Sequence, residues 1–155
     1  MSRLSAIAIA ATLVLGSGAL PSAWAGGSTH DPPPDLSGRK HVGVASYYAK
    51  RFAGREMANG APMNPHGNNA ASRTLPLGTT AKVTNLETGK SAVVRIEDRG
   101  PYVKGRIVDL SPTTARKIGI TPRKGISRVV VAPIRVPLPN GRVKRGAGAT
   151  RRPPA

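Results

Sequence analysis

Short segments of alternating residue character, separated by turn-forming residues, set the strongest limit on the fold of this chain. Segments 80–85 (TAKVTN) and 91–97 (SAVVRIE) are joined by a loop whose Gly89 suits a β-hairpin. Further strands are predicted at 42–48, 106–110 and 127–134. Only 3% of the 155 residues are aromatic, so a core must consist mainly of Val, Ile, Leu and Ala. Such a small core is feasible when the sheet closes on itself, and we predict a compact, mainly β barrel.

One short helix is predicted between the last two of these strands, over residues 112–117. Ser111 is a suitable N-cap, and Pro112 fits the first helical position because its fixed φ matches a helix. Gly119 provides a stop signal.

The two ends of the chain differ in composition from this central region. Residues 1–25 combine Arg3, an apolar run over 4–20 and the small-x-small pattern Ala23-Trp24-Ala25, which predicts a cleaved signal peptide. A retained membrane anchor is the alternative. We expect a Pro-rich linker over 26–40, one domain over 41–134 and a disordered basic tail over 135–155. The protein is then exported to the periplasm or cell envelope, and without cysteine it is not expected to be a lipoprotein.

The charge balance is strongly basic, with 24 Lys and Arg residues against seven acidic residues and a net charge of +17. Such an excess favours a polyanionic partner. For an exported protein this points to anionic envelope polymers, bound through the basic tail, and not to nucleic acid. A solvated tail without a partner is the alternative.

A series of short motifs resembles a known family. In order, they are Gly43-Val44-Ala45-Ser46-Tyr47-Tyr48, Ala58-Asn59-Gly60, Thr74-Leu75-Pro76-Leu77-Gly78, Val83-Thr84-Asn85-Leu86, Asp98-Arg99-Gly100-Pro101 and Gly105-Arg106-Ile107-Val108-Asp109-Leu110-Ser111. Together they are similar to the rare lipoprotein A (RlpA) family, over about residues 42–134. The resemblance implies a six-stranded double-psi β-barrel with one or two short helices, related to expansins. It also implies peptidoglycan glycan strands as the target, with lytic transglycosylase activity. We expect a monomer that needs no cofactor.

Asp98 is the first candidate for catalysis. A lytic transglycosylase needs one carboxylic acid that protonates the glycosidic oxygen and then takes the proton of the sugar's own C6 hydroxyl, which leaves a 1,6-anhydro product. Asp98 follows a strand at a Gly-Pro turn, and in the resemblance it matches the catalytic Asp of the Asp-Arg-Gly-Pro motif. Bonding to the backbone of the turn is the structural alternative.

Asp109 is the second catalytic candidate, because its counterpart in expansin-like barrels is linked to the active groove. Its structural alternative is bonding to the turn around Ser111. We expect no pairing between Glu97 and Asp98, since neighbours on a strand point to opposite faces.

Candidate substrate-binding residues surround these carboxyls. Tyr47, Tyr48 and Tyr102 are suited to stacking on sugar rings, and core packing is their alternative. The remaining candidates are Asn59, Ser72 and Arg99.

The chain departs from the family pattern at two positions. Ala61 replaces the usual Glu after the Ala-Asn-Gly motif, and Ser72 replaces the usual His before Thr-Leu-Pro. His66 is the nearest residue that would substitute, and simple exposure is its alternative. These departures favour an expansin-like module that binds or loosens the wall without cleavage, as the alternative to an enzyme. A general polyanion binder is a third hypothesis. Three histidines and no cysteine do not suit a usual structural zinc site.

Overall fold

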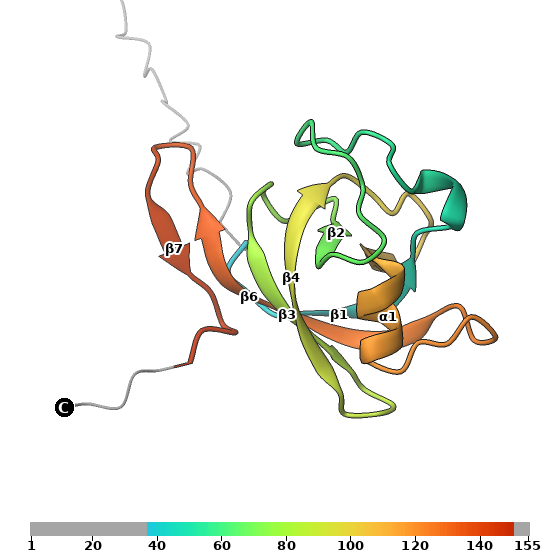
Figure 1. Ribbon diagram of the computed structural model, residues 1–155. Helices are drawn as coiled ribbons and strands as arrows, with labels where there is room; N and C mark the ends of the chain where they lie inside the picture. The colour runs from blue at the N-terminus through green and yellow to red at the C-terminus, as the bar shows by residue number, and fades with distance from the viewer. Residues whose placement is uncertain (1–36, 151–155) are drawn as a thin grey trace, which may run out of the picture. The chain divides into compact units, whose positions relative to one another are not determined.

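The computed structural model describes residues 37–150 (Figure 1). The predicted signal peptide and most of the predicted linker, together with residues 151–155, lie outside the described residues. The strands are β1 (His41–Tyr47), β2 (Asn69–Ala71), β3 (Thr80–Asn85), β4 (Ser91–Asp98), β5 (Arg106–Leu110), β6 (Ser127–Pro137) and β7 (Val143–Arg145). The helices are the 3-10 turn η1 (Lys50–Phe52) and α1 (Pro112–Lys117).

Six of the strands close into a barrel. The order of neighbours is β1-β5-β2-β4-β3-β6, and β6 also pairs with β1, which closes the ring. The pairs β1–β5 and β2–β4 are parallel, whereas the other pairs in the ring are antiparallel. The prediction of a mainly β, six-stranded barrel with short helices is confirmed.

Small aliphatic side chains fill the barrel, as the low aromatic content requires. Strand β4 buries Ala92, Val94 and Ile96 while the residues between them stay exposed, so its alternation is clean. Closure removes the free sheet edges of the ring, which lets a small core suffice.

Helix α1 covers one end of the barrel and begins as predicted. The Ser111 hydroxyl accepts a hydrogen bond from the Thr114 amide at 3.2 Å, and Pro112 occupies the first turn. Beyond the helix, Gly119 has a φ of +86°, a left-handed conformation that favours glycine. This turn directs Ile118 and Ile120 into the core.

Two strands were not expected from the sequence pattern. Strand β2 has only three residues, all buried, so it shows no alternation. Strand β7 pairs with β6 outside the ring (Figure 1), and β6 itself continues to Pro137. The expectation of a disordered tail from residue 135 is therefore wrong for the part described here, where residues 135–150 contain a hairpin joined by backbone hydrogen bonds. Within residues 37–150, no helix has the length and apolar character needed to cross a membrane.

Candidate active site

An open groove lies where β1, β4 and β5 meet the segment after β4, and it has a cavity volume of about 390 Å³. Both predicted catalytic carboxyls, Asp98 and Asp109, line it. The other polar and aromatic residues of its lining are Ser46, Tyr47, Tyr48, Arg51, Phe52, Arg99, Tyr102 and Arg106.

Asp98 is the last residue of β4, and three hydrogen bonds hold its carboxylate. Oδ1 accepts from the backbone amides of Ala58 and Arg99, at 2.9 and 2.8 Å. Oδ2 accepts from the Tyr48 hydroxyl at 2.9 Å. The structural alternative for Asp98 is thus partly realised, since Oδ1 does bind the backbone of its own turn. Among residues 37–150 the one partner of Oδ2 is the tyrosine, so Oδ2 keeps a lone pair for a group in the groove.

Tyr48, which donates a hydrogen bond to Asp98, is itself held in place by packing. Its side chain is only 8% exposed and packs with Met57, Met63 and Ala71. Burial raises the pKa of the Tyr48 hydroxyl, and the hydrogen bond to Asp98 raises it further. Tyr48 therefore stays protonated and acts as a fixed donor.

Asp109 lies in β5 and is also half-buried. Its Oδ1 accepts a hydrogen bond from the Ser46 hydroxyl of β1. Burial raises the pKa of the Asp109 carboxyl, while the Ser46 hydrogen bond and the charge of Arg106 lower it, and the charge of Asp98 raises it again. Asp109 is therefore the groove carboxyl whose surroundings favour its protonated form.

Strand register explains why the two carboxyls meet although they belong to different strands. Ala71 of β2 pairs with Asp98 of β4 on one side and with Asp109 of β5 on the other. Asp109 in turn pairs with Ser46 of β1. The four positions form one row across four strands. Asp98 therefore lies on one side of the small, buried Ala71, and Asp109 lies on the other side.

The comparisons with known proteins agree with this geometry. Residues 40–131 match the family described as lytic transglycolase. The chain belongs to this family. The match and the closed six-stranded ring together establish the double-psi β-barrel that the motifs implied.

Several curated relatives of the chain are named endolytic peptidoglycan transglycosylase RlpA. A probable endolytic peptidoglycan transglycosylase RlpA of Synechocystis is 56% identical over 78 residues, which are 50% of this chain and 24% of the relative. The endolytic peptidoglycan transglycosylase RlpA of Pasteurella multocida is 44% identical over 116 residues, 75% of this chain and 39% of that protein. The endolytic peptidoglycan transglycosylase RlpA of Pseudomonas aeruginosa is 43% identical over 105 residues, which are 68% of this chain and 30% of that protein. The matches thus span well under half of each of these relatives.

The remaining substrate-binding candidates divide into those that line the groove and those that do not. Tyr47 and Tyr102 line the groove, where Tyr47 also packs on the core and Tyr102 is 78% exposed. Arg99 lines it as well, but its Nη1 donates to the backbone carbonyls of Ser72 and Leu75, at 3.0 and 2.8 Å. The Arg99 guanidinium therefore joins the groove to the turn after β2.

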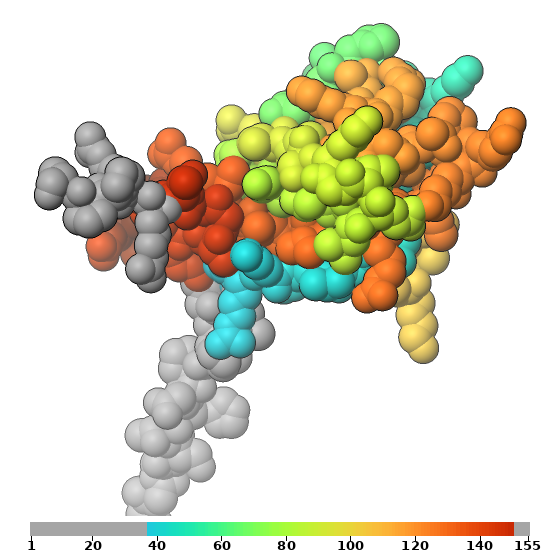
Figure 2. All heavy atoms as spheres, turned by 90° about the horizontal axis from the view of Figure 1, so that it is seen from below, coloured from blue at the N-terminus to red at the C-terminus, as the bar shows by residue number. Residues whose placement is uncertain are grey.

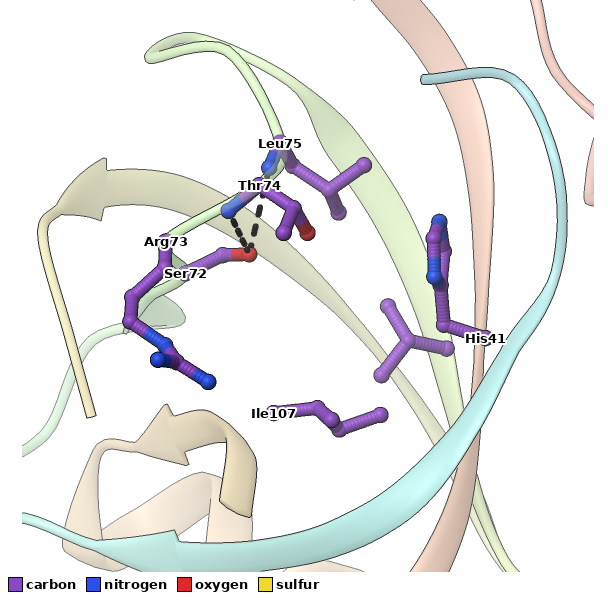
Figure 3. Close-up of a pocket in the computed structure, with 7 residues that line it drawn as sticks. His41, Ser72, Arg73, Thr74, Leu75 and Ile107 are labelled. Carbon is purple, nitrogen blue, oxygen red and sulfur yellow. Dashed lines mark hydrogen bonds between the residues drawn. The ribbon is translucent and has the colours of Figure 1, made fainter. Parts of the chain in front are cut away.

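Ser72 and Asn59 do not lie in the groove lining. The Ser72 side chain is buried and its Oγ accepts from the amides of Thr74 and Leu75, both at 3.3 Å, beside a separate small cavity that also contains His41 (Figure 3). Asn59 Oδ1 accepts from the Ala61 amide at 3.0 Å and is exposed. Both side chains organise turns of this family member, and neither replaces a missing groove residue.

The Ala61 departure removes a charge without opening a polar site. Ala61 is partly buried against the cluster that contains Tyr48, Met57 and Met63. His66 and Glu56 are both exposed, and neither lines the groove. Glu97 does not line the groove, as expected for a neighbour of Asp98 on a strand, and its Oε1 is 3.5 Å from Arg95 Nε.

Sequence reasoning missed the groove roles of Ser46, Arg51, Phe52 and Arg106. The residue types give no local signal for them, since Ser46 and Asp109 are 63 positions apart and meet only through the parallel β1–β5 pair. Nowhere in residues 37–150 do three or more His, Asp and Glu side chains gather in a way that could hold a metal ion.

Proposed function

We propose that the protein cleaves the glycan strands of peptidoglycan as a lytic transglycosylase, with Asp98 as the general acid and base. The observation that carries this proposal is the position of the Asp98 carboxyl in an open groove, held by Tyr48 and two backbone amides, with Asp109 across Ala71. The relatives' names and the family support the same reaction class.

The proposed reaction needs one proton and no water. The Asp98 carboxyl donates its proton to the glycosidic oxygen as the bond from that oxygen to the anomeric carbon breaks. The C6 hydroxyl oxygen of the same sugar then bonds to the anomeric carbon, and its proton passes to the Asp98 carboxylate. The products are a 1,6-anhydro end and a free hydroxyl on the leaving strand, and Asp98 recovers its starting state.

Asp109 supplies the second acidic group near Asp98 that Ala61 does not. The charge of Asp98 is one of the causes that raise the pKa of the Asp109 carboxyl, so the two carboxyls interact across the groove. We assign Asp98 to the substrate because its Oδ2 keeps a free lone pair, and Asp109 to a supporting role as the neighbouring carboxyl of the groove. Direct catalysis by Asp109 is the alternative for this pair.

Digestion of purified sacculi tests the reaction. The wild-type protein should release anhydro-muropeptides detectable by mass, and Asp98→Asn should release none. Glu87→Gln is the matched control, because Glu87 is an acid outside the groove that pairs with Lys124. If Asp98→Asn retains activity while Asp109→Asn loses it, the roles of the two carboxyls are exchanged.

A non-catalytic wall-binding or wall-loosening module is the second candidate function. The apolar packing of Ala61 and the burial of Ser72 in a turn favour it, because neither position contributes a proton carrier to the groove. Binding of wild type and Asp98→Asn to sacculi, with no soluble product from either, would establish this function in place of the enzyme.

We further propose export of the chain to the periplasm or cell envelope through residues 1–25, with the excess of basic residues assisting contact with anionic envelope polymers. Cell fractionation of the full chain, compared with a variant that lacks residues 1–25, tests export. Retention of both in the cytoplasm would contradict it.

A further inference from the structure

Three arginines lie in one row across the outer face of strands β4, β6 and β7. Arg135 of β6 is paired with Arg145 of β7, and Thr80 of β3 is paired with both Arg135 and Arg95 of β4. Directly paired residues of neighbouring strands project to the same face of a sheet. All three arginines are exposed there.

The strand spacing sets the spacing of these charges. Neighbouring strands are about 4.8 Å apart, so the backbones at Arg135 and Arg145 are about 5 Å apart and those at Arg95 and Arg135 about 10 Å apart. The row runs across the strands and is open along its length, which suits an extended chain with repeated anionic groups.

The charges of the row are largely uncompensated. Arg95 has Glu97 at 3.5 Å, whereas neither Arg135 nor Arg145 forms an ion pair with any residue between 37 and 150. The Arg145 guanidinium donates a hydrogen bond to the Thr150 carbonyl, at 2.7 Å. Like charges placed directly opposite each other across strands destabilise the pairing, so an anion bound between Arg135 and Arg145 would relieve a cost within the fold.

The same face also offers apolar contact. Two shallow hollows meet at Arg135 and Val143: one also contains Thr80, Arg95 and Pro137, and the other contains Arg145. Val143 is 50% exposed. Strand β7 and the end of β6 form this surface at one side of the barrel, as the orange-to-red atoms of Figure 2 show. An acidic peptide offers carboxylates to Arg135 and Arg145 and also aliphatic groups to Val143 and Pro137, whereas a lipid headgroup offers only its phosphate.

We propose that this arginine row, defined as Arg95, Arg135 and Arg145, binds the carboxylates of the peptide stems of peptidoglycan. The proposal rests on the proposed function only in taking peptidoglycan as the target. Both Arg135 and Arg145 lie beyond residues 40–131, where the family match ends, and neither lines the catalytic groove. The row is thus a second site, separate from the groove.

Pelleting with sacculi tests the row, in an Asp98→Asn background so that the sacculi stay intact. Arg135→Gln/Arg145→Gln is compared with Arg123→Gln/Arg128→Gln, which removes the same charge from exposed positions outside the row. At about 0.5 kcal/mol for each exposed ion pair, the loss of two pairs should make the first double variant bind intact sacculi about fivefold more weakly than the control at low salt. This difference should shrink as salt screens the charges.

Two further substrates identify the anion. On sacculi whose stems an amidase has removed, the two double variants should bind alike, and on phosphatidylglycerol vesicles they should also bind alike. Equal binding of both double variants to intact sacculi overturns the proposal. A deficit of the Arg135→Gln/Arg145→Gln variant that persists on stem-free glycan, or that occurs only on vesicles, overturns it as well, because the ligand is then not the stem.

Thermal unfolding separates binding from folding. Relief of the opposed charges predicts that Arg135→Gln/Arg145→Gln is no less stable than the control. The binding readout also stays independent of catalysis, so absence of anhydro products would refute the proposed enzyme without touching the arginine row.

Discussion

The hydrogen bond from Tyr48 to Asp98 gives the sharpest test of the site, through the substitution Tyr48→Phe. This change removes one hydroxyl and keeps the aromatic ring that packs with Met57 and Met63. A hydrogen bond to a charged group contributes about 1.5–3 kcal/mol to stability. Water can reach the half-exposed Asp98 carboxylate from the groove and replace part of this bond, so we expect a loss of about 1–2 kcal/mol.

Urea and thermal unfolding measure this loss. For a domain of this size, about 1–2 kcal/mol corresponds to a fall in Tm of roughly 4–10 °C. Tyr47→Phe is the matched control, because Tyr47 is the neighbouring tyrosine in the same groove and no hydrogen bond is found for its hydroxyl among the described residues. We expect the control to change stability by less than about 0.5 kcal/mol.

A double-mutant cycle with Asp98→Ala assigns the effect to the pair. If the hydroxyl acts through Asp98, Tyr48→Phe should cost much less in the Asp98→Ala background, with a coupling of about 1 kcal/mol or more. Equal costs in both backgrounds, or a Tyr48→Phe variant as stable as Tyr47→Phe, would refute the reasoning. Anhydro-product release by Tyr48→Phe should also fall, because Asp98 Oδ2 loses the hydrogen bond from the Tyr48 hydroxyl.

Three further predictions concern the groove carboxyl, the helix cap and the turn after β2. Because the folded-state pKa of Asp109 is raised, the folded protein keeps a proton that the unfolded chain releases, so stability falls as pH rises from the ordinary aspartate range through that raised pKa. Asp109→Asn should therefore flatten the stability profile from about pH 4 upward, as measured by urea unfolding, and an unchanged slope would contradict the burial of this carboxyl. Ser111→Ala should cost about 1–2 kcal/mol in the same assay, since its buried hydroxyl accepts from the Thr114 amide and donates to the Gly67 carbonyl. Arg99→Gln should raise the rate of proteolysis between residues 72 and 77, because two backbone carbonyls of that turn lose their donor; an unchanged rate would show that the turn holds without it.

Strand pattern predicted most of the barrel because alternation is a local property. The segments at 80–85 and 91–97 needed only their own side chains to be identified, and both are strands in the structure. Strand β2 has three residues that are buried throughout, so it carries no period to detect. Strand β7 lies in a segment rich in arginine, and it forms because the edge of β6 offers backbone partners, which composition does not reveal.

The site was predictable where a motif marks it and not where distant strands meet. Asp98 and Asp109 were found from the family resemblance, and both line the groove. Ser72 was predicted from its motif position, yet its hydroxyl is used by the amides of its own turn. Position in a motif does not fix the direction of a side chain when a serine replaces a longer histidine.

The row Ser46, Asp109, Ala71 and Asp98 shows how this topology produces chemistry from so few acidic residues. Strand β2 separates β4 from β5, so the two aspartates are held about two strand spacings, or about 10 Å, apart at the backbone. A larger residue at position 71 would clash, because Ala71 is buried and packs with Tyr48, Met57 and Met63. The short strand that sequence pattern failed to reveal is thus the element that couples the two carboxyls. A barrel that lacks the family's glutamate at position 61 still holds a second acid near Asp98, because strand register, and not proximity in sequence, places it there.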